Sequence, residues 1–402
     1  MGEQAQALSG LKVIDLSWHI AGPYCTKLLA DLGADVMKIE RPGKGDPSRE
    51  EGPFPDDEPN LEASGLFSYL NNNKKSITLN LKTKRGVEMI KSLVKDADVL
   101  VENFRPGVMA ALGLGYDVLK KINPKLVMTS ISNFGQTGEF RNYEATELIT
   151  QAMSGFLSSV GDPDREPLRA GGALRMLEYN TGVFAGMSTL TAVIGRRMSG
   201  QGEHLDVSIT ECGILQRSYP TVQNSYPTAP AKYTKRYMMM PSIERCKDGY
   251  IGISILTGQH WQDFCVMTEM YEWIADERFT TLDKRLENKE VFQERFDKWL
   301  MEHTKEEIIQ LGSEWRIPVN LVPDFEEMVD LPQYQERGSF EKVHHPVIGE
   351  VIQPGAPFHM SETPWKINRP APLLGEHNTD VYQKILGLPE EDVSKLYTEG
   401  VI

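Results

Sequence analysis

Short apolar runs alternate with segments of helical periodicity through the first third of the chain. Five runs rich in aliphatic and β-branched residues are typical of buried strands: residues 11–17, 35–40, 76–81, 98–102 and 125–132. The segments between them carry apolar residues at helical spacing, and Gly22-Pro23 and Gly33 mark the start and the end of the first helix. Regular alternation of strand and helix predicts an α/β fold built on a large, doubly wound (Rossmann-like) parallel sheet with right-handed crossovers.

A further helix is predicted from about residue 182 to residue 197. Its apolar residues recur at helical spacing: Val183, Phe184, Met187, Leu190, Val193 and Ile194. Gly182 and its small neighbours would let another backbone approach this helix closely, and Gly200 ends it. A half-buried strand is predicted next, because apolar residues alternate there with polar ones: Leu205, Val207 and Ile209.

Glu178 stands immediately before this predicted helix, between Leu177 and Tyr179. A carboxylate in an apolar collar at a helix start can act as a nucleophile or hold a charge. A carboxylate that only balances the helix dipole is the alternative, and the neighbouring residues leave both open. The preceding Gly171-Gly172 turn could offer backbone N–H groups to an oxyanion.

The pattern changes after residue 212. The segment RYMMMPSIERCKDGYIGISI alternates like a β-hairpin with Asp248-Gly249 as its turn. Amphipathic helices are expected in three places: residues 259–271, 287–303 and 305–316. These elements predict a small α/β domain beside the large one. The expected division is a large α/β domain over residues 1–220, a linker and small α/β domain over 221–330, and a C-terminal segment returning to the large domain over 331–402.

Composition narrows the classes of partner. The net charge of −14 argues against a nucleic-acid surface, although a local basic cluster can still hold a phosphorylated small ligand. No run of about 18 apolar residues occurs and the N-terminus lacks a secretory pattern, so no membrane partner is expected and the cytoplasm is the expected location. The four cysteines form no Cys-x-x-Cys pair and the histidines show no ligand spacing, so we expect reduced thiols and no metal site.

The loops beside the predicted strands carry groups suited to a nucleotide-like ligand. The turn SWHIAGP is not G-x-G-x-x-G, so the nicotinamide or flavin fingerprint is absent. After the fourth strand, Asn103 can hydrogen-bond a base or an amide, Phe104 can stack and Arg105 can bind phosphate. Each of the three could equally be an ordinary turn residue. Basic residues around the second and third strands form either a phosphate rim or a solvated surface: Lys38, Arg41, Lys44, Arg49, Lys74 and Lys75.

Several segments together resemble the class III coenzyme A (CoA) transferases, the family of formyl-CoA and carnitine CoA-transferases. In that family an acid, three residues, a glycine and a small-residue helix precede T-G-x-G-Q and a V-D-V-S strand. Here Glu178, Gly182 and SGQGEHLDVSITE follow the same order. The segments KIERPGKGDPSRE, ENFRPG, ELITQAMSG, PQYQERG and HHPVIGE match further family segments in order, so the resemblance covers essentially the whole chain.

The resemblance implies transfer of CoA from an acyl-CoA donor, such as succinyl-CoA, to a small carboxylic acid through an enzyme-bound anhydride and thioester. Coenzyme A is then a substrate, and no further cofactor is implied. Glu178 stands where the family has an Asp nucleophile. The implied CoA-binding positions, to which Arg105 is added for its charge, are His19, Ile20, Ala21, Arg41, Asn73, Lys74, Lys75, Asn103, Phe104 and Arg105. The family also implies an interlocked, ring-like dimer.

Two alternatives stay open at this level. Glu178 has one methylene more than the Asp of the family, and it can still be a working nucleophile. Alternatively, this chain is the non-catalytic subunit of a heterodimer or heterotetramer, and a paralogous chain carries the Asp. Two-gene transferases of the benzylsuccinate type, in anaerobic aromatic degradation, are pairs of this kind. The second alternative is an α-methylacyl-CoA racemase, which needs a His directly before the acid of ELITQ, where this chain has Thr146.

Overall fold

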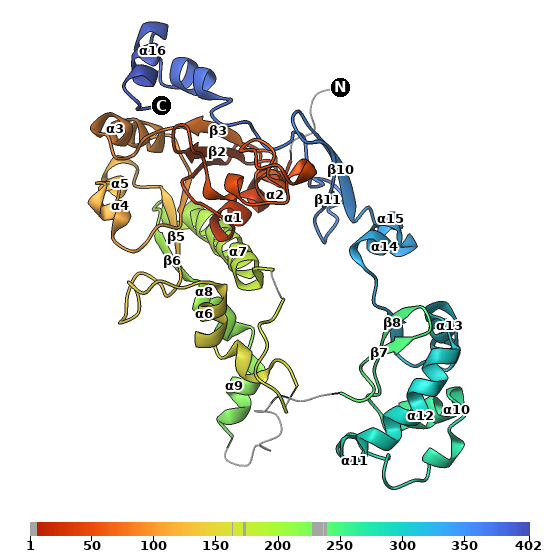
Figure 1. The fold of residues 1–402 in the computed structure, drawn as a ribbon. Helices are drawn as coiled ribbons and strands as arrows, with labels where there is room; N and C mark the ends of the chain where they lie inside the picture. Colours follow the sequence, from red (N-terminus) through yellow and green to blue (C-terminus); the bar gives the residue numbers. More distant parts are fainter. Residues whose placement is uncertain (1–5, 163, 172–173, 227–235, 237–238) are drawn as a thin grey trace. The chain divides into compact units, whose positions relative to one another are not determined.

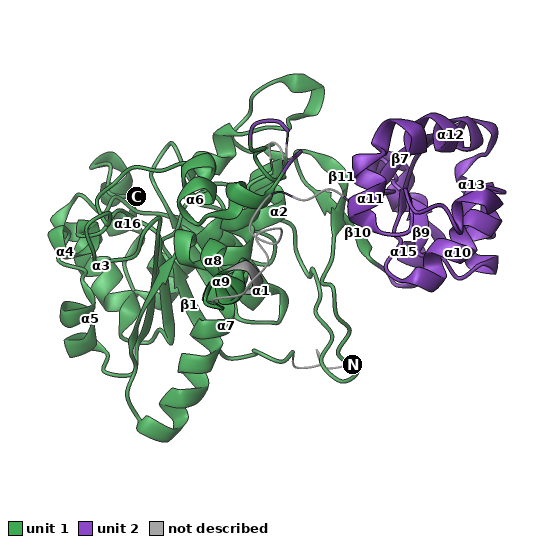
Figure 2. Ribbon diagram, turned by 90° about the horizontal axis from the view of Figure 1, so that it is seen from below, with its two compact units in different colours: residues 1–160, 167–229, 339–402 green, residues 161–166, 230–338 purple. Residues whose placement is uncertain are grey.

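The computed structural model describes residues 6–162, 164–171, 174–226, 236 and 239–402 (Figure 1). The chain forms two compact units, which Figure 2 distinguishes by colour. Unit 1 comprises residues 1–160, 167–229 and 339–402, and unit 2 comprises residues 161–166 and 230–338. The expected domain bounds at residues 220 and 330 stay a prediction, because compactness alone does not test whether a segment folds independently.

Unit 1 is built on a six-stranded sheet with the order β3-β2-β1-β4-β5-β6, in which every neighbouring pair is parallel. Its strands are β1 (Lys12–Asp15), β2 (Asp35–Glu40), β3 (Lys75–Thr78), β4 (Val99–Glu102), β5 (Val127–Ser132) and β6 (His204–Ser208). This confirms the predicted doubly wound sheet. The strand order reverses between β1 and β4, and open α/β sheets bind ligands beside the carboxyl ends of the strands at such a switch point.

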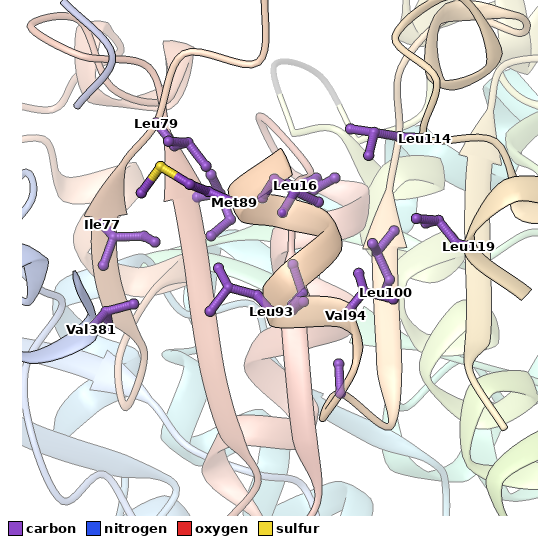
Figure 3. Close-up of a cluster of buried hydrophobic side chains, with 14 of the residues drawn as sticks. Leu16, Ile77, Leu79, Met89, Leu93, Val94, Leu100, Leu114, Leu119 and Val381 are labelled. Atoms are coloured by element: carbon purple, nitrogen blue, oxygen red, sulfur yellow. The ribbon is translucent and has the colours of Figure 1, made fainter. Parts of the chain in front are cut away.

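Helices cover both faces of this sheet. On one face, α1 (Ala21–Asp31) and α7 (Met176–Ser199) pack against alternate strand residues, namely Val13, Val36, Val99, Val101, Val127 and Ile131. The other face lies under α3 (Lys84–Val94), α5 (Tyr116–Ile122) and α16 (Glu390–Thr398). Figure 3 shows side chains of this second cluster, among them Met89, Leu93, Leu16, Ile77 and Leu100. The period-two alternation of the strands thus supplies two apolar faces.

Shorter elements complete unit 1. They are η1 (Pro47–Glu50), η2 (Pro55–Asp57), α2 (Gly65–Leu70), α4 (Val108–Ala111), α6 (Glu147–Met153), η3 (Phe156–Ser159), α8 (Ile209–Leu215), α9 (Ser218–Asn224), β10 (Phe340–His345), β11 (Gly349–Pro354) and η6 (Asp380–Ile385). β10 and β11 pair as an antiparallel ribbon. None of the described helices has both the length and the hydrophobicity needed to cross a bilayer.

α7 begins earlier than its apolar periodicity predicts. Its first residue is Met176, so Glu178 lies inside the first turn and not before the helix. Its end is as predicted, because Gly200 adopts φ 70° and donates its N–H to the carbonyl of Arg196 at 2.8 Å. A Cβ added to Gly182 would lie 2.8 Å from the carbonyl oxygen of Ala21, which confirms the expected close approach of another backbone.

β6 also ends one residue short of the predicted strand. The hydroxyl of Ser208 accepts a hydrogen bond from the backbone N–H of Glu211 at 3.2 Å and caps α8. Ile209 therefore begins a helix and does not continue the strand.

Unit 2 combines a three-stranded antiparallel sheet with helices, in the order β7-β8-β9. Its elements are β7 (Ile243–Cys246), β8 (Gly249–Ile253), α10 (Gly258–Met267), η5 (Tyr271–Trp273), α11 (Leu282–Glu287), α12 (Lys289–Glu302), α13 (Lys305–Glu314), β9 (Val319–Leu321), α14 (Phe325–Asp330) and α15 (Pro332–Glu336). The predicted hairpin is present, but its two loop residues are Lys247 and Asp248, because Cys246 pairs with Gly249.

Candidate active site

Two loops meet at the switch point of the sheet in unit 1. Asn103, after β4, accepts a hydrogen bond from the backbone N–H of Trp18 at 2.8 Å and donates its amide to the carbonyl of Trp18 at 2.7 Å. The rings of Phe104 and Trp18 pack edge to face, with centroids 5.1 Å apart. These contacts fix the loop after β1 against the loop after β4, at the edge where a ligand is expected.

A cavity of about 1010 Å³ lies on one side of these loops. Its walls are largely apolar, with Leu81, Phe104 and Leu112 among the lining residues. Cationic side chains also line it: Arg41, Lys44, Lys82 and Arg105. The Arg41 guanidinium stacks 4.6 Å from the Trp18 ring centroid. We call this space the outer cavity, and its apolar walls and positive charges suit a base that carries phosphates.

A second cavity, of about 770 Å³, adjoins the outer cavity and is called the acyl cavity below. The two spaces share several lining residues, namely His19, Asn103, Phe104, Arg105 and Val108. Charged side chains are prominent in the wall of the acyl cavity: Arg141, Arg169, Arg175, Glu147 and Glu178. An elongated ligand could therefore reach Glu178 from the outer cavity past Asn103.

Glu178 is a partly buried carboxylate in the first turn of α7. Its side chain makes no hydrogen bond or ion pair with any residue that the structure describes. Desolvation raises the pKa of Glu178 to about 7, with Arg175 opposing this rise and the nearby charges of Glu147 and Glu51 adding to it. A carboxylate that no neighbour neutralises is available for covalent chemistry.

Glu51 links two residues that line the acyl cavity, His19 and Arg175. One carboxylate oxygen lies 3.0 Å from Nδ1 of His19, and the other accepts a hydrogen bond from Nη2 of Arg175 at 2.7 Å. Arg175 directly precedes α7, so Glu51 ties the loop after β1 to the start of the helix that carries Glu178. Sequence analysis did not identify Glu51, because it lies far from both partners along the chain and in no recognisable motif.

Glu147 is the second carboxylate of the acyl cavity and is 5% exposed. Its Oε1 accepts hydrogen bonds from the backbone N–H of Leu177 at 2.9 Å and from Nε2 of Gln151 at 2.8 Å. Its Oε2 is buried without a hydrogen-bond partner among the described residues. Glu147 thus satisfies a free N–H group at the start of α7, which fixes where Glu178 stands.

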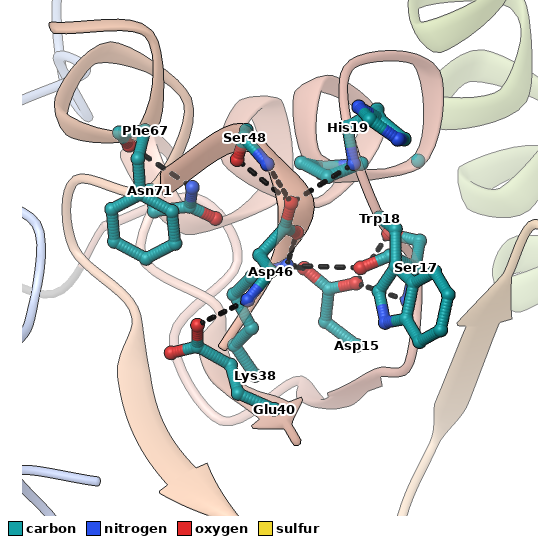
Figure 4. Close-up of polar contacts among 12 residues, drawn as sticks. Asp15, Ser17, Trp18, His19, Lys38, Glu40, Asp46, Ser48, Phe67 and Asn71 are labelled. Carbon is teal, nitrogen blue, oxygen red and sulfur yellow. Dashed lines mark hydrogen bonds and ion pairs between the residues drawn. The ribbon is translucent and has the colours of Figure 1, made fainter. Parts of the chain in front are cut away.

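A buried network of charges supports the loop after β1 (Figure 4). Asp46 accepts a hydrogen bond from the backbone N–H of His19 at 3.1 Å and pairs with Lys38 at 2.8 Å. Asp15 pairs with Lys74 at 3.1 Å. Burial opposes ionisation of Asp15, but Lys38 and Lys74 outweigh it and hold the pKa of that carboxyl well below its usual range. This network therefore fixes the backbone of His19 through Asp46.

The structure brings together some of the residues expected to bind CoA and not others. His19, Ala21, Asn103, Phe104 and Arg105 line the acyl cavity, and Arg41 lines the outer cavity. The remaining four line neither cavity: Ile20, Asn73, Lys74 and Lys75.

Those four residues have other surroundings. Ile20 is buried, and Lys74 is enclosed in the network with Asp15. Asn73 donates to Asp31 at 2.7 Å, and Lys75 pairs with Asp35 at 2.6 Å. Their role in binding CoA stays a prediction. Of the expected oxyanion turn, Gly171 is described with φ 74°, and Gly172 lies outside the described residues.

No group of three His, Cys, Asp or Glu side chains among the described residues is placed to hold a metal ion.

Comparison with known proteins gives one consistent result. The model of CoA-transferase family III matches residues 8–378. The chain is similar to the succinyl-CoA–D-citramalate CoA-transferase of Chloroflexus aurantiacus, with 31% identity over 98% of each chain. It is also similar to the succinyl-CoA:glutarate CoA-transferase of Homo sapiens, with 30% identity over 98% of this chain and 90% of the relative. Among solved structures, a CAIB/BAIF family protein from Brucella suis matches with a TM-score of 0.84 and 28% identity, over 95% of this chain and 100% of the other.

Proposed function

The chain belongs to CoA-transferase family III, and from that premise we propose that it transfers CoA from an acyl-CoA donor, such as succinyl-CoA, to a carboxylic acid acceptor, with Glu178 as the nucleophile. The observation that carries the proposal is the unpartnered Glu178 carboxylate in the wall of the acyl cavity, next to a cavity suited to a nucleotide. The names of the relatives support succinyl-CoA as a donor.

The proposed reaction proceeds by covalent catalysis. A carboxylate oxygen of Glu178 attacks the thioester carbonyl carbon and the C–S bond breaks. CoA leaves as a thiolate, and the donor acyl group stays joined to Glu178 as a mixed anhydride. The thiolate then attacks the side-chain carbonyl carbon of Glu178, which releases the donor acid as a carboxylate and leaves CoA joined to Glu178 as a thioester. The acceptor carboxylate attacks that thioester, and the thiolate released attacks the acceptor carbonyl carbon, which restores Glu178.

The residues around Glu178 support these reaction steps by holding it in place and by limiting its contact with water. Glu147 holds the first turn of α7 through Leu177, and Glu51 holds Arg175 beside it. Desolvation of Glu178 strengthens its nucleophilicity, because the ionised form is less stabilised by water than on a surface. Thr146, at the position where a racemase needs a His base, offers only a hydroxyl group.

We also propose that the chain works as an interlocked dimer, either with itself or with a paralogous subunit. A stripe of apolar side chains along α7 supports a partner there, since each is exposed: Val183 (46%), Met187 (59%), Ile194 (61%) and Met198 (92%). These residues share one face of the helix, and exposed apolar stripes of this length are typical of contact surfaces. A cytoplasmic location and a place in anaerobic aromatic degradation stay predictions.

Trapping of the covalent intermediate tests the proposal. The purified protein is incubated with succinyl-CoA, treated with hydroxylamine or borohydride, and digested for peptide mass spectrometry. A modification on Glu178, absent from Glu178→Gln, would establish the nucleophile. If this chain carries no adduct, and transfer requires an added Asp-bearing subunit and survives Glu178→Gln, the chain is instead the non-catalytic subunit.

A further inference from the structure

The wall of the acyl cavity contains four arginines: Arg105, Arg141, Arg169 and Arg175. Two of them already have an ionic partner. Arg105 pairs with Glu144 at 2.6 Å, and Arg175 pairs with Glu51 at 2.7 Å. Arg141 and Arg169 are exposed, like Arg165, and form neither an ion pair nor a hydrogen bond with the residues that the structure describes. The cavity wall therefore contributes two guanidinium groups that have no protein partner among the described residues and that a bound anion could reach.

The phosphates of CoA do not account for these two groups. The outer cavity has its own cations, among them Arg41, Lys44 and Lys82, which do not line the acyl cavity. Arg169 acts electrostatically on Glu178 and lies on the side of the nucleophile. Since the thioester must reach Glu178, groups beside that carboxylate face the acyl end of the substrate.

The charge of the site changes during the proposed reaction. When Glu178 is acylated, its negative charge is lost, and the other carboxylate of the wall, Glu147, is hydrogen-bonded to Leu177 and Gln151. The negative charge on which Arg169 acts at Glu178 is then removed, and neither Arg141 nor Arg169 has a paired carboxylate among the described residues. A carboxylate at the far end of the acyl group would supply it, because guanidinium groups bind carboxylates through paired, charge-assisted hydrogen bonds.

We infer that Arg141 and Arg169 form a subsite for a second carboxylate, so that the acyl groups handled at Glu178 derive from dicarboxylic acids. This inference rests on the proposed function. It assigns a role that monocarboxylic acyl groups cannot fulfil, since they offer these arginines no anion once the thioester or anhydride has formed.

Binding of two unreactive thioethers tests the subsite. S-(3-Carboxypropyl)-CoA carries the remote carboxylate, and S-(3-carbamoylpropyl)-CoA replaces it by a neutral amide of nearly the same shape. Calorimetric titration of the oligomeric protein should show the carboxylate bound about tenfold more tightly or better. Arg169→Gln and Arg141→Gln should each reduce this preference, and the double variant should abolish it, while the affinity for the amide stays within about twofold of wild type.

Arg165→Gln is the matched control. Arg165 is an exposed arginine near Arg169 in sequence and does not line the acyl cavity, so the variant should keep the full preference. Equal affinities for the two thioethers in the wild type, or a preference that survives the double variant, would overturn the subsite. Circular dichroism and melting curves check that the variants remain folded.

The two proposals fail separately. Adducts on Glu178 formed equally well from succinyl-CoA and butyryl-CoA, with no preference between the thioethers, would keep the nucleophile and remove the subsite. A clear preference for the carboxylate without any adduct on Glu178 would keep the subsite and remove the nucleophile.

Discussion

At the scale of single residues, the environment of each buried carboxylate decides its state. Asp15 is enclosed by Lys38 and Lys74 and stays ionised. Glu178 has no ion-pair partner in the part of the chain that the structure describes, and burial raises its pKa to about 7. Burial raises the pKa of Glu102 to about 7 as well, against hydrogen bonds from Ser130 and the N–H of Phe104. The same functional group, a carboxyl, thus serves as a fixed charge in the network beside His19 and as a titrating group in the acyl cavity.

The pH dependence of transfer should report Glu178. The nucleophile is the ionised form, so a pKa of about 7 predicts that kcat/KM falls as pH drops through 7, approaching tenfold per pH unit, and levels off above it. Steady-state rates between pH 5 and 9 measure this decrease in kcat/KM, called the acid limb of the pH profile. Glu102→Gln is the control, because Glu102 has a similar pKa and lines neither cavity. Loss of the limb in that variant would assign it to Glu102 and contradict the prediction.

Two adjacent lysines should differ sharply in their effect on stability. Lys74→Met removes one of the cations that pair with the buried Asp15. Breaking a buried ion pair lowers the free energy of unfolding by about 3 kcal/mol or more. Lys75 and Asp35 pair with side chains 28% and 45% exposed, so Lys75→Met should cost less than about 1 kcal/mol. Urea unfolding measures both. Similar losses in the two variants would contradict the buried network.

The same pair of variants examines the expected role of these lysines in CoA binding. Neither side chain lines a cavity, so Lys75→Met should leave the affinity for CoA within about twofold of wild type, as measured by calorimetry. A large loss of affinity in Lys75→Met would instead support the role that the family resemblance implies.

At the scale of helices and strands, the crossing of α1 and α7 depends on one glycine. A Cβ at Gly182 would lie 2.8 Å from the carbonyl oxygen of Ala21, so Gly182→Ala should destabilise the protein by about 1–3 kcal/mol. Gly195 lies on the same helix with no atom within 4 Å of such a Cβ, and Gly195→Ala should stabilise it by about 0.5–1 kcal/mol. Thermal or urea unfolding distinguishes the signs, and equal effects would mean that the helices do not cross closely.

Many of the helices and strands could be predicted from the sequence. The strands of the large sheet and the end of α7 at Gly200 follow from local patterns of apolar residues and glycine. The start of α7 does not, because Arg175 provides no side-chain cap and the N–H of Leu177 is satisfied by Glu147, thirty positions earlier. Local patterns carry no information about such a bond, which exists only once the chain has folded.

The site residues likewise divide into those that local sequence predicts and those that only the folded structure identifies. Asn103 and Phe104 stand at a strand end, where parallel sheets bind ligands, and were predicted once the family resemblance was added to that position. Glu51 was not predicted, and Asp46 and Glu147 entered only as members of family segments without a role, since each acts through a partner brought near by folding. A polar residue in a loop is common, and only its distance to His19, Arg175 or Leu177 distinguishes it.

At the scale of the whole molecule, the exposed stripe on α7 should be covered by a second chain. Met187→Glu places a charge in the stripe, so sedimentation velocity should show a shift from dimer toward monomer relative to the wild type. Met301→Glu, at a residue 48% exposed on α12 of unit 2, is the control and should leave the dimer intact. A wild-type protein that sediments as a stable folded monomer would contradict the proposed assembly.

The last part of the chain completes the edge of the sheet in unit 1. The backbone N–H of Thr78 donates to Asn378 at 2.8 Å, that of Asn80 donates to the carbonyl of Val401 at 2.7 Å, and Gly400 lines the outer cavity. During synthesis, β3 therefore leaves the ribosome some 300 residues before Asn378, although its strand partner β2 has already been made. The wall of the outer cavity thus gains Gly400 long after its other lining residues have been made, so the wall is complete only when this late segment has folded back onto β3.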